Sequence, residues 1–106
     1  MDNILIEEKT NMVKIIDFGF SVLCSQTQKL KIFCGTPSYM APEITLKKEY
    51  DGKVVDMWAL GVLLYVMLTG VFPFKGISEA DLYHKIQKGN FSIPEFVSRQ
   101  ARKIIF

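Results

Sequence analysis

Two oxygen-bearing side chains, Asn3 and Asp17, are the first candidates for chemistry in this sequence. They flank two short, apolar runs, Ile4–Ile6 and Val13–Ile16, which are separated by the polar residues 7–11 and predict a β-hairpin. In an antiparallel pair, the residue before the first strand and the residue after the second emerge at the same end. We therefore expect a carboxylate and an amide oxygen to meet there, and such oxygens suit a hard cation.

A long irregular loop is expected after the hairpin. From Phe18 to Met40 neither the period of a strand nor that of a helix persists, and glycine and proline residues interrupt the pattern. Loops of this length inside a compact domain are usually functional or disordered. Ala41-Pro42-Glu43 then predicts a short helix, because proline suits the first turn and an acidic residue is favourable there. The charged stretch Lys47–Lys53 is expected to be a surface loop.

The most apolar segment predicts a long helix over residues 54–69. The uncharged stretch Met57–Phe74 reaches the length at which a membrane span is suspected. Gly70 and Pro73 predict a stop near Thr69, so the part from Asp56 onward would cover only ~21 Å, against ~30 Å of hydrocarbon. We therefore expect no membrane span. A helix that is apolar on nearly every face should be a buried central helix, surrounded by protein.

Two further helices are predicted after a turn segment. Ser78-Glu79-Ala80-Asp81 resembles a capping box and predicts a helix over residues 78–89, with a glycine at its end. His84 lies on the polar face of this helix and is expected in solvent rather than in a metal site. Ser98 is expected to cap a last helix that reaches Phe106 in mid-pattern.

Composition favours one small folded domain. Of the 106 residues, 49% are hydrophobic and 23% are charged, which is typical of a chain that packs a core. The net charge is only +2 and the two signs alternate, so a nucleic-acid-binding stripe has no support. Cys24 and Cys34 are expected to be free thiols in a reducing compartment, because no signal-peptide pattern precedes them. We therefore expect an intracellular, cytoplasmic protein.

Five short motifs follow one another along the chain and together resemble a eukaryotic serine/threonine protein kinase. Phe33-Cys34-Gly35 and Asp81–Ile86 are similar to the calcium/calmodulin-dependent and AMP-activated kinase group. The resemblance covers the whole chain and corresponds to part of the C-terminal lobe, from the asparagine of the catalytic loop to the helix after the substrate-side helix. The motifs are, in order, Asp17-Phe18-Gly19, Gly35-Thr36-Pro37-Ser38-Tyr39, Ala41-Pro42-Glu43, Asp56-Met57-Trp58-Ala59-Leu60-Gly61-Val62 and Phe72-Pro73-Phe74.

The resemblance implies that Asp17 and Asn3 bind Mg²⁺ and, through it, the co-substrate ATP. Hard Mg²⁺ requires oxygen ligands, which these two side chains offer. An alternative for Asp17 is a turn carboxylate at a strand end. Met1 and Asp2 would belong with Asn3 to the tail of the catalytic loop. Phe18 would pack under an upper lobe, and Gly19 would give the loop freedom to change its conformation.

The resemblance also assigns residues to the protein substrate. Thr36 would position the substrate hydroxyl, although a plain turn residue before Pro37 is the alternative. Tyr39 and Met40 would line the pocket for the residue after the phosphorylated one. Glu43 would be structural and would pair with an arginine beyond residue 106.

Three residues of the long apolar helix would be structural. Asp56 would accept hydrogen bonds from the catalytic-loop backbone, and an N-cap explains the same aspartate equally well. Trp58 is expected in the core, and Gly61 completes the motif.

By the same resemblance, the chain divides into four parts of one partial kinase domain. These are residues 1–17 (hairpin and metal site), 18–43 (activation segment), 54–69 (buried central helix) and 78–89 (substrate-side helix). The predicted fold class is mainly α with a short β-hairpin, as part of a two-lobed α+β parent fold.

The sequence departs from the family pattern in two ways. Ile32 stands where related kinases often carry a phosphorylated threonine, which leaves constitutive ordering, control through Ser25 or Thr27, or a degenerate loop. The Gly-rich loop, the phosphate-binding lysine and the catalytic aspartate lie N-terminal to Asn3 in the family order, so the 106 residues alone are expected to be inactive. The expected function is that of a fragment of a serine/threonine kinase, which transfers the γ-phosphate of ATP to proteins. A non-catalytic, kinase-like docking module is the alternative.

Overall fold

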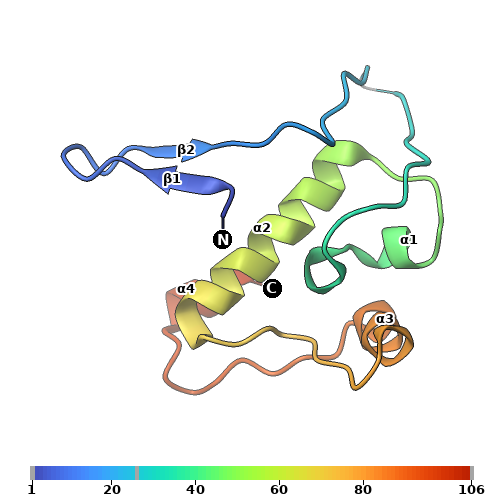
Figure 1. The fold of residues 1–106 in the computed structure, drawn as a ribbon. Helices are drawn as coiled ribbons and strands as arrows, with labels where there is room; N and C mark the ends of the chain where they lie inside the picture. Colours follow the sequence, from blue (N-terminus) through green and yellow to red (C-terminus); the bar gives the residue numbers. More distant parts are fainter. Residues whose placement is uncertain (1, 26, 106) are drawn as a thin grey trace.

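The computed structural model describes residues 2–25 and 27–105, and the predictions that involve Met1 and Phe106 lie outside these residues. A single long helix, α2 (Gly52–Thr69), runs through the middle of the fold (Figure 1). The hairpin lies on one side of α2, and α1 and α3 lie on the other. The structure is mainly helical with one short hairpin, which is the fold class predicted from the sequence. In chain order, the elements are β1 (Ile4–Ile6), β2 (Val13–Ile15), the 3₁₀ helix η1 (Pro37–Tyr39), α1 (Pro42–Thr45), α2, α3 (Glu79–Lys88) and α4 (Arg99–Ile105).

The predicted hairpin is confirmed. Strands β1 and β2 pair in antiparallel fashion, with Ile4 opposite Ile15 and Ile6 opposite Val13. The Asn11 N–H donates to the Glu7 carbonyl at 2.8 Å and closes the connecting turn. All of β2 is exposed, so packing against the rest of the described chain contributes little to the hairpin.

Helix α2 begins earlier than predicted, inside the stretch that was expected to be a loop. The Asp51 carboxylate accepts a hydrogen bond from the Lys53 N–H at 2.9 Å and caps the first turn. Asp56 therefore lies one turn inside the helix, and the alternative that it is the N-cap is wrong. The predicted end is confirmed, because Gly70 adopts φ 75° and its N–H donates to the Val66 carbonyl.

Within the described chain α2 is buried along one side only, and its burial by further protein stays a prediction. Only Val55, Val62 and Tyr65 are buried, whereas Met57 and Met67 are 64% and 67% exposed. The helix packs along one side, against η1 and α4. Its 18 residues correspond to ~27 Å, so the length argument against a membrane span fails. By length and composition, α2 is the one described helix that could cross a bilayer, which is weak evidence because core helices of soluble proteins pass the same test.

The core lies on the side of α2 that carries Val55. It consists of Leu30, Ala41, Ile44, Tyr50 and Val55, with Trp58 packed against it. A second, aromatic group extends it along the helix. In that group, the Trp58 ring stacks on Phe74 at 6.0 Å between centroids, and Phe91 contacts both Phe74 and Tyr65 edge to face. Trp58, which was predicted to be a core residue, is half-buried and packs against the core cluster.

The predicted helix after Ser78 is confirmed as α3. The Ser78 Oγ accepts from the Asp81 N–H at 3.2 Å, and Gly89 ends the helix with φ 67°. In a capping box the Asp81 carboxylate would accept from the Ser78 N–H. Here it accepts from the Ile77 N–H and from the Lys85 ammonium, and the bond with Lys85 lowers the pKa of the Asp81 carboxyl. The predicted cap of α4 is also present, because the Ser98 Oγ accepts from the Ala101 N–H at 3.2 Å.

Gly61 offers a test of the space beside α2, because it lines a cavity with Trp58, Tyr65 and Ile104. A Cβ at this position would meet no atom within 4 Å. We expect Gly61→Ala to stabilise the 106-residue chain by about 1 kcal/mol, because alanine favours a helix interior. Urea unfolding followed by circular dichroism measures this. Gly89→Ala is the matched control, since its site is equally open but its φ of 67° makes alanine destabilising by about 1 kcal/mol. A destabilised Gly61→Ala chain would contradict the open space beside Gly61.

Candidate functional site

The hairpin brings the backbone of Asn3 beside the residue that precedes Asp17. The Ile16 N–H donates to the Asn3 carbonyl at 3.0 Å, which continues the antiparallel register past the last paired residues. Both side chains are exposed at this end of the hairpin. The register of the hairpin backbone is therefore the reason that Asn3 and Asp17 are expected to meet.

Asp17 itself has an unusual backbone conformation. Its φ is 66°, a left-handed value that is uncommon outside glycine and is often found at functional sites. The Asp17 Oδ1 accepts from the Gly19 N–H at 3.0 Å, which fixes one carboxylate oxygen. The other oxygen makes no hydrogen bond within the described residues and is available to a ligand.

Limited space, rather than a special dihedral angle, favours glycine at position 19. It is not among the glycines with positive φ, but a Cβ on it would lie 3.0 Å from the Asp17 Oδ1. Any side chain there would press on the carboxylate. The neighbouring Phe18 is 69% exposed, and no described residue covers it in the way that an upper lobe would.

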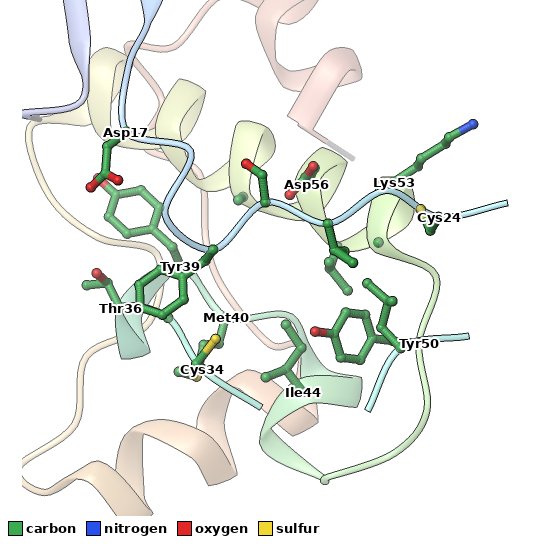
Figure 2. Close-up of a pocket in the computed structure, with 18 of the residues that line it drawn as sticks. Asp17, Cys24, Cys34, Thr36, Tyr39, Met40, Ile44, Tyr50, Lys53 and Asp56 are labelled. Atoms are coloured by element: carbon green, nitrogen blue, oxygen red, sulfur yellow. The ribbon is translucent and has the colours of Figure 1, made fainter. Parts of the chain in front are cut away.

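Asp17 and Thr36 both line a cavity of about 620 Å³ between the loop 18–40 and helices α1 and α2. Figure 2 shows Asp17, Tyr39 and Thr36 at one end of this cavity, and Cys24 and Lys53 at the other. Asp56 is exposed and contributes to the wall between them. The cavity therefore gathers four of the predicted site residues, Asp17, Thr36, Tyr39 and Asp56, which are separated in sequence by up to two helices.

Thr36 lies immediately before η1 and is exposed. Its carbonyl accepts from the Tyr39 N–H at 2.9 Å, whereas its hydroxyl makes no cap bond. The hydroxyl is therefore free to contact a ligand in the cavity. Two aromatic contacts hold the residues that follow: Tyr39 meets Phe72 edge to face at 5.3 Å, and the Tyr83 hydroxyl lies 3.7 Å from the Met40 Sδ.

The remaining predicted residues are structural in character. Ala41 is fully buried, Pro42 begins α1, and Glu43 lies in its first turn. Glu43 makes no ion pair with the part of the chain that the structure describes. The Trp58 Nε1 is buried and has no hydrogen-bond partner among the described residues.

The donor set at the hairpin end fits a hard cation. A free carboxylate oxygen of Asp17 and the amide oxygen of Asn3 are the kind of ligand that Mg²⁺ takes, and Mg²⁺ normally completes its shell with water and phosphate oxygens. No cluster of three or more His, Cys, Asp or Glu side chains occurs in residues 2–25 and 27–105. The pair is therefore suited to a cation that arrives with a phosphate rather than to an all-protein cage.

Sequence reasoning missed Tyr50 and Asp51. Tyr50 is buried in the core and lines the cavity, although it stands in the stretch predicted to be a surface loop. The feature of the sequence that could have indicated the burial of Tyr50 is an aromatic residue within a charged segment. Asp51 could have been found, because aspartate directly before a helix is a favoured N-cap.

Comparison with known proteins gives a consistent result. A family model described as "Protein kinase domain" matches residues 1–105. "Putative sperm motility kinase W" of Mus musculus is 48% identical over 103 residues, which are 97% of this chain and 20% of the relative. "Serine/threonine-protein kinase SIK3 homolog" of Danio rerio is 46% identical over 98% of this chain and 9% of its own length. "Probable serine/threonine-protein kinase MARK-A" of Dictyostelium discoideum is 41% identical over 98% of this chain and 10% of its own. The chain thus spans one tenth to one fifth of these relatives.

Proposed function

This chain belongs to the protein kinase family, and from that premise we propose that it is the metal-binding and substrate-binding part of a serine/threonine protein kinase. The proposed reaction is transfer of the γ-phosphate of ATP to serine or threonine residues of protein substrates. The names of the relatives support the residue specificity. The order of the five sequence motifs is the basis for placing the chain in the C-terminal lobe, and the name of the SIK3 relative supports the calcium/calmodulin-dependent and AMP-activated group.

The observation that carries the proposal is the register of the hairpin. Because the Ile16 N–H bonds to the Asn3 carbonyl, the amide of Asn3 and the carboxylate of Asp17 emerge at one end of the hairpin. Phosphoryl transfer depends mainly on positioning and on neutralisation of charge, for which Mg²⁺ held beside the phosphates is the usual means. Asp17 and Asn3 would hold that ion.

The cavity beside Asp17 suits the acceptor side of the reaction. The free hydroxyl of Thr36 lies on the same cavity and would position the hydroxyl of the substrate. Tyr39 and Met40, held by Phe72 and Tyr83, would contact the next residue of the substrate. Asp56, exposed on the cavity wall, would accept hydrogen bonds from a catalytic-loop backbone. Because the reaction consumes ATP, we place the protein inside the cell, with α2 as a core helix.

The 106 residues alone are proposed to be inactive. No residue in the described part of the chain stands at the family position of the catalytic aspartate, the phosphate lysine or the Gly-rich loop. General-base and phosphate-binding groups each contribute large factors to the rate. The alternative proposal is a non-catalytic docking module, which the exposed surface of α3 would serve.

The proposal is tested by completing the kinase domain with the matching parts of a relative. Residues 1–106 replace the matched segment in the kinase domain of the mouse relative, and the product is called the complemented kinase. We expect it to transfer labelled phosphate from Mg²⁺-ATP to a serine peptide but not to its alanine counterpart, and we expect the 106 residues alone to transfer none. The unmodified mouse domain is the control.

Two results would contradict these expectations. An inactive complemented kinase, with an active mouse domain beside it, would contradict the catalytic proposal and favour the docking module. Transfer by the 106 residues alone would contradict the proposed inactivity.

A further inference from the structure

The middle of the loop 18–40 is attached to the segment just before α2. The Leu30 N–H donates to the Tyr50 carbonyl at 2.8 Å, and the Tyr50 N–H donates to the Leu30 carbonyl at 3.1 Å. The Tyr50 hydroxyl donates to the carbonyl of Ile32. Tyr50 thus binds two alternate residues of the loop, one through its backbone and one through its side chain.

Burial strengthens this attachment. Leu30 and Tyr50 are each 8% exposed and belong to the core cluster with Ala41, Ile44 and Val55. The Phe33 ring packs against Tyr50 at 6.3 Å. Burial also raises the pKa of Tyr50, which further favours the protonated hydroxyl that donates to Ile32. The neighbouring Lys31–Glu49 ion pair is 72% and 54% exposed and contributes little.

The same loop is held a second time, close to η1. Tyr39 packs on Phe72, and Met40 accepts the Tyr83 hydroxyl. Five residues, 34–38, span the interval between the two attachments, and Thr36 is in the middle of them. Gly35 makes the turn there with φ 137°, a conformation that favours glycine. The place of Thr36 is thereby set by both attachments.

No covalent modification is needed for this arrangement. Residues 28–35 contain no serine, threonine or tyrosine, so none of them can accept a phosphate on a hydroxyl group. The contacts to Tyr50 use backbone groups and apolar side chains only. The hydrogen bonds and the ring contact of Tyr50 with the loop involve Leu30, Ile32 and Phe33, so serine and threonine residues elsewhere in the loop, such as Ser25, lie outside the attachment.

We propose that Tyr50 is a positioning residue, which holds residues 30–36 in place without phosphorylation and so sets the position of Thr36. The attachment itself is independent of the proposed function. The consequence for Thr36 rests on the proposed function, because it concerns the positioning of the substrate hydroxyl.

The attachment is tested by amide hydrogen exchange of the 106-residue chain without nucleotide. Tyr50→Phe removes the hydroxyl and leaves the Ile32 carbonyl without its partner, so we expect the Leu30 and Tyr50 amides to exchange about tenfold faster. The Leu82 amide of α3 and the amide of its C-cap, Gly89, should be unchanged. Tyr65→Phe is the matched control, because the Tyr65 hydroxyl also donates from a buried ring to a backbone carbonyl, that of Ser92.

Three results would overturn the attachment: unprotected Leu30 and Tyr50 amides in the unmodified chain, equal effects of Tyr50→Phe and Tyr65→Phe on Leu30, or faster exchange in α3 as well. The first means that no attachment forms, and the other two mean that it is not local.

The consequence for Thr36 is tested in the complemented kinase. Tyr50→Phe should lower kcat severalfold while KM for ATP stays constant, and phosphatase treatment should not lower the activity. A change confined to KM for ATP, or activity lost with phosphatase, would contradict the positioning role. Since exchange is measured without catalysis, an inactive complemented kinase overturns the proposed function and leaves the attachment judged by exchange alone.

Discussion

Asp17→Asn in the complemented kinase is expected to lower kcat by on the order of 100-fold or more. The substitution keeps the size of the side chain and an acceptor for the Gly19 N–H, which bonds Asp17 Oδ1 at 3.0 Å. It removes the negative charge that would hold Mg²⁺ against the phosphates. Loss of a single group that stabilises developing charge costs ~10²–10³ in rate. Steady-state kinetics with a serine peptide, at several Mg²⁺ concentrations, measures the effect.

Glu8→Gln provides the matched control. Glu8 is an exposed carboxylate in the turn of the same hairpin, and it makes no contact in the cavity. Its removal changes the net charge equally and should leave kcat unchanged. Asn3→Ala should reduce the rate less than Asp17→Asn, because it removes a neutral ligand. Equal rates for Asp17→Asn and Glu8→Gln would contradict metal binding by Asp17.

Ile86→Ala should cause the largest loss of stability. Ile86 is fully buried in α3, which packs against α1 and η1, and no larger side chain in the described residues is as completely enclosed. Truncation of a buried isoleucine to alanine removes apolar burial and leaves a cavity, at a cost of about 2–5 kcal/mol. The urea midpoint of the complemented kinase should fall accordingly.

Ile77→Ala is the control for Ile86. Ile77 is 100% exposed and lies just before the Ser78 cap, so its truncation should change stability by less than ~0.5 kcal/mol. The two variants differ in burial and not in chemistry. Similar midpoints for both would contradict the packing of α3 described above.

The parts of the fold that could be predicted from the sequence are those with local signals. The hairpin follows from two β-branched runs, and α3 follows from Ser78 and Gly89, which cap it within one turn of each end. The end of α2 was predicted for the same reason, because Gly70 adopts a conformation that other residues disfavour. Capping and turn chemistry depend on neighbours in sequence and are therefore readable there.

The parts that could not be predicted depend on distant contacts. The burial of Tyr50 depends on residues distant in sequence, such as Leu30, which pairs with it from twenty positions earlier, and no pattern near Tyr50 encodes that partner. The apolar character of α2 indicated burial on all faces, but hydrophobicity states what a helix can bury and not what covers it. The start of α2 was misplaced because two aspartates, Asp51 and Asp56, both resemble caps.

The site was predictable to the same extent. The motif around Asp17 and the hairpin register were sufficient to place Asn3 and Asp17 at one end of the hairpin. The shared cavity of Asp17 and Thr36 required the path of the loop 18–40, which has no period. The attachment of that loop at two points could be predicted only with the ring contacts of Tyr39 and Tyr50 known.

The stacking of Trp58 on Phe74 gives the chain an optical reporter. Trp58 is the single tryptophan in the sequence, so all indole fluorescence comes from the contact between α2 and the segment after it. Its Nε1 is enclosed, and the partner ring of Phe74 is 5% exposed, so the indole emits from an apolar environment. Separation of these two rings would expose the indole to water and shift its emission to longer wavelength. The emission wavelength of Trp58 therefore reports whether α2 and the segment after it are packed together at the centre of the fold.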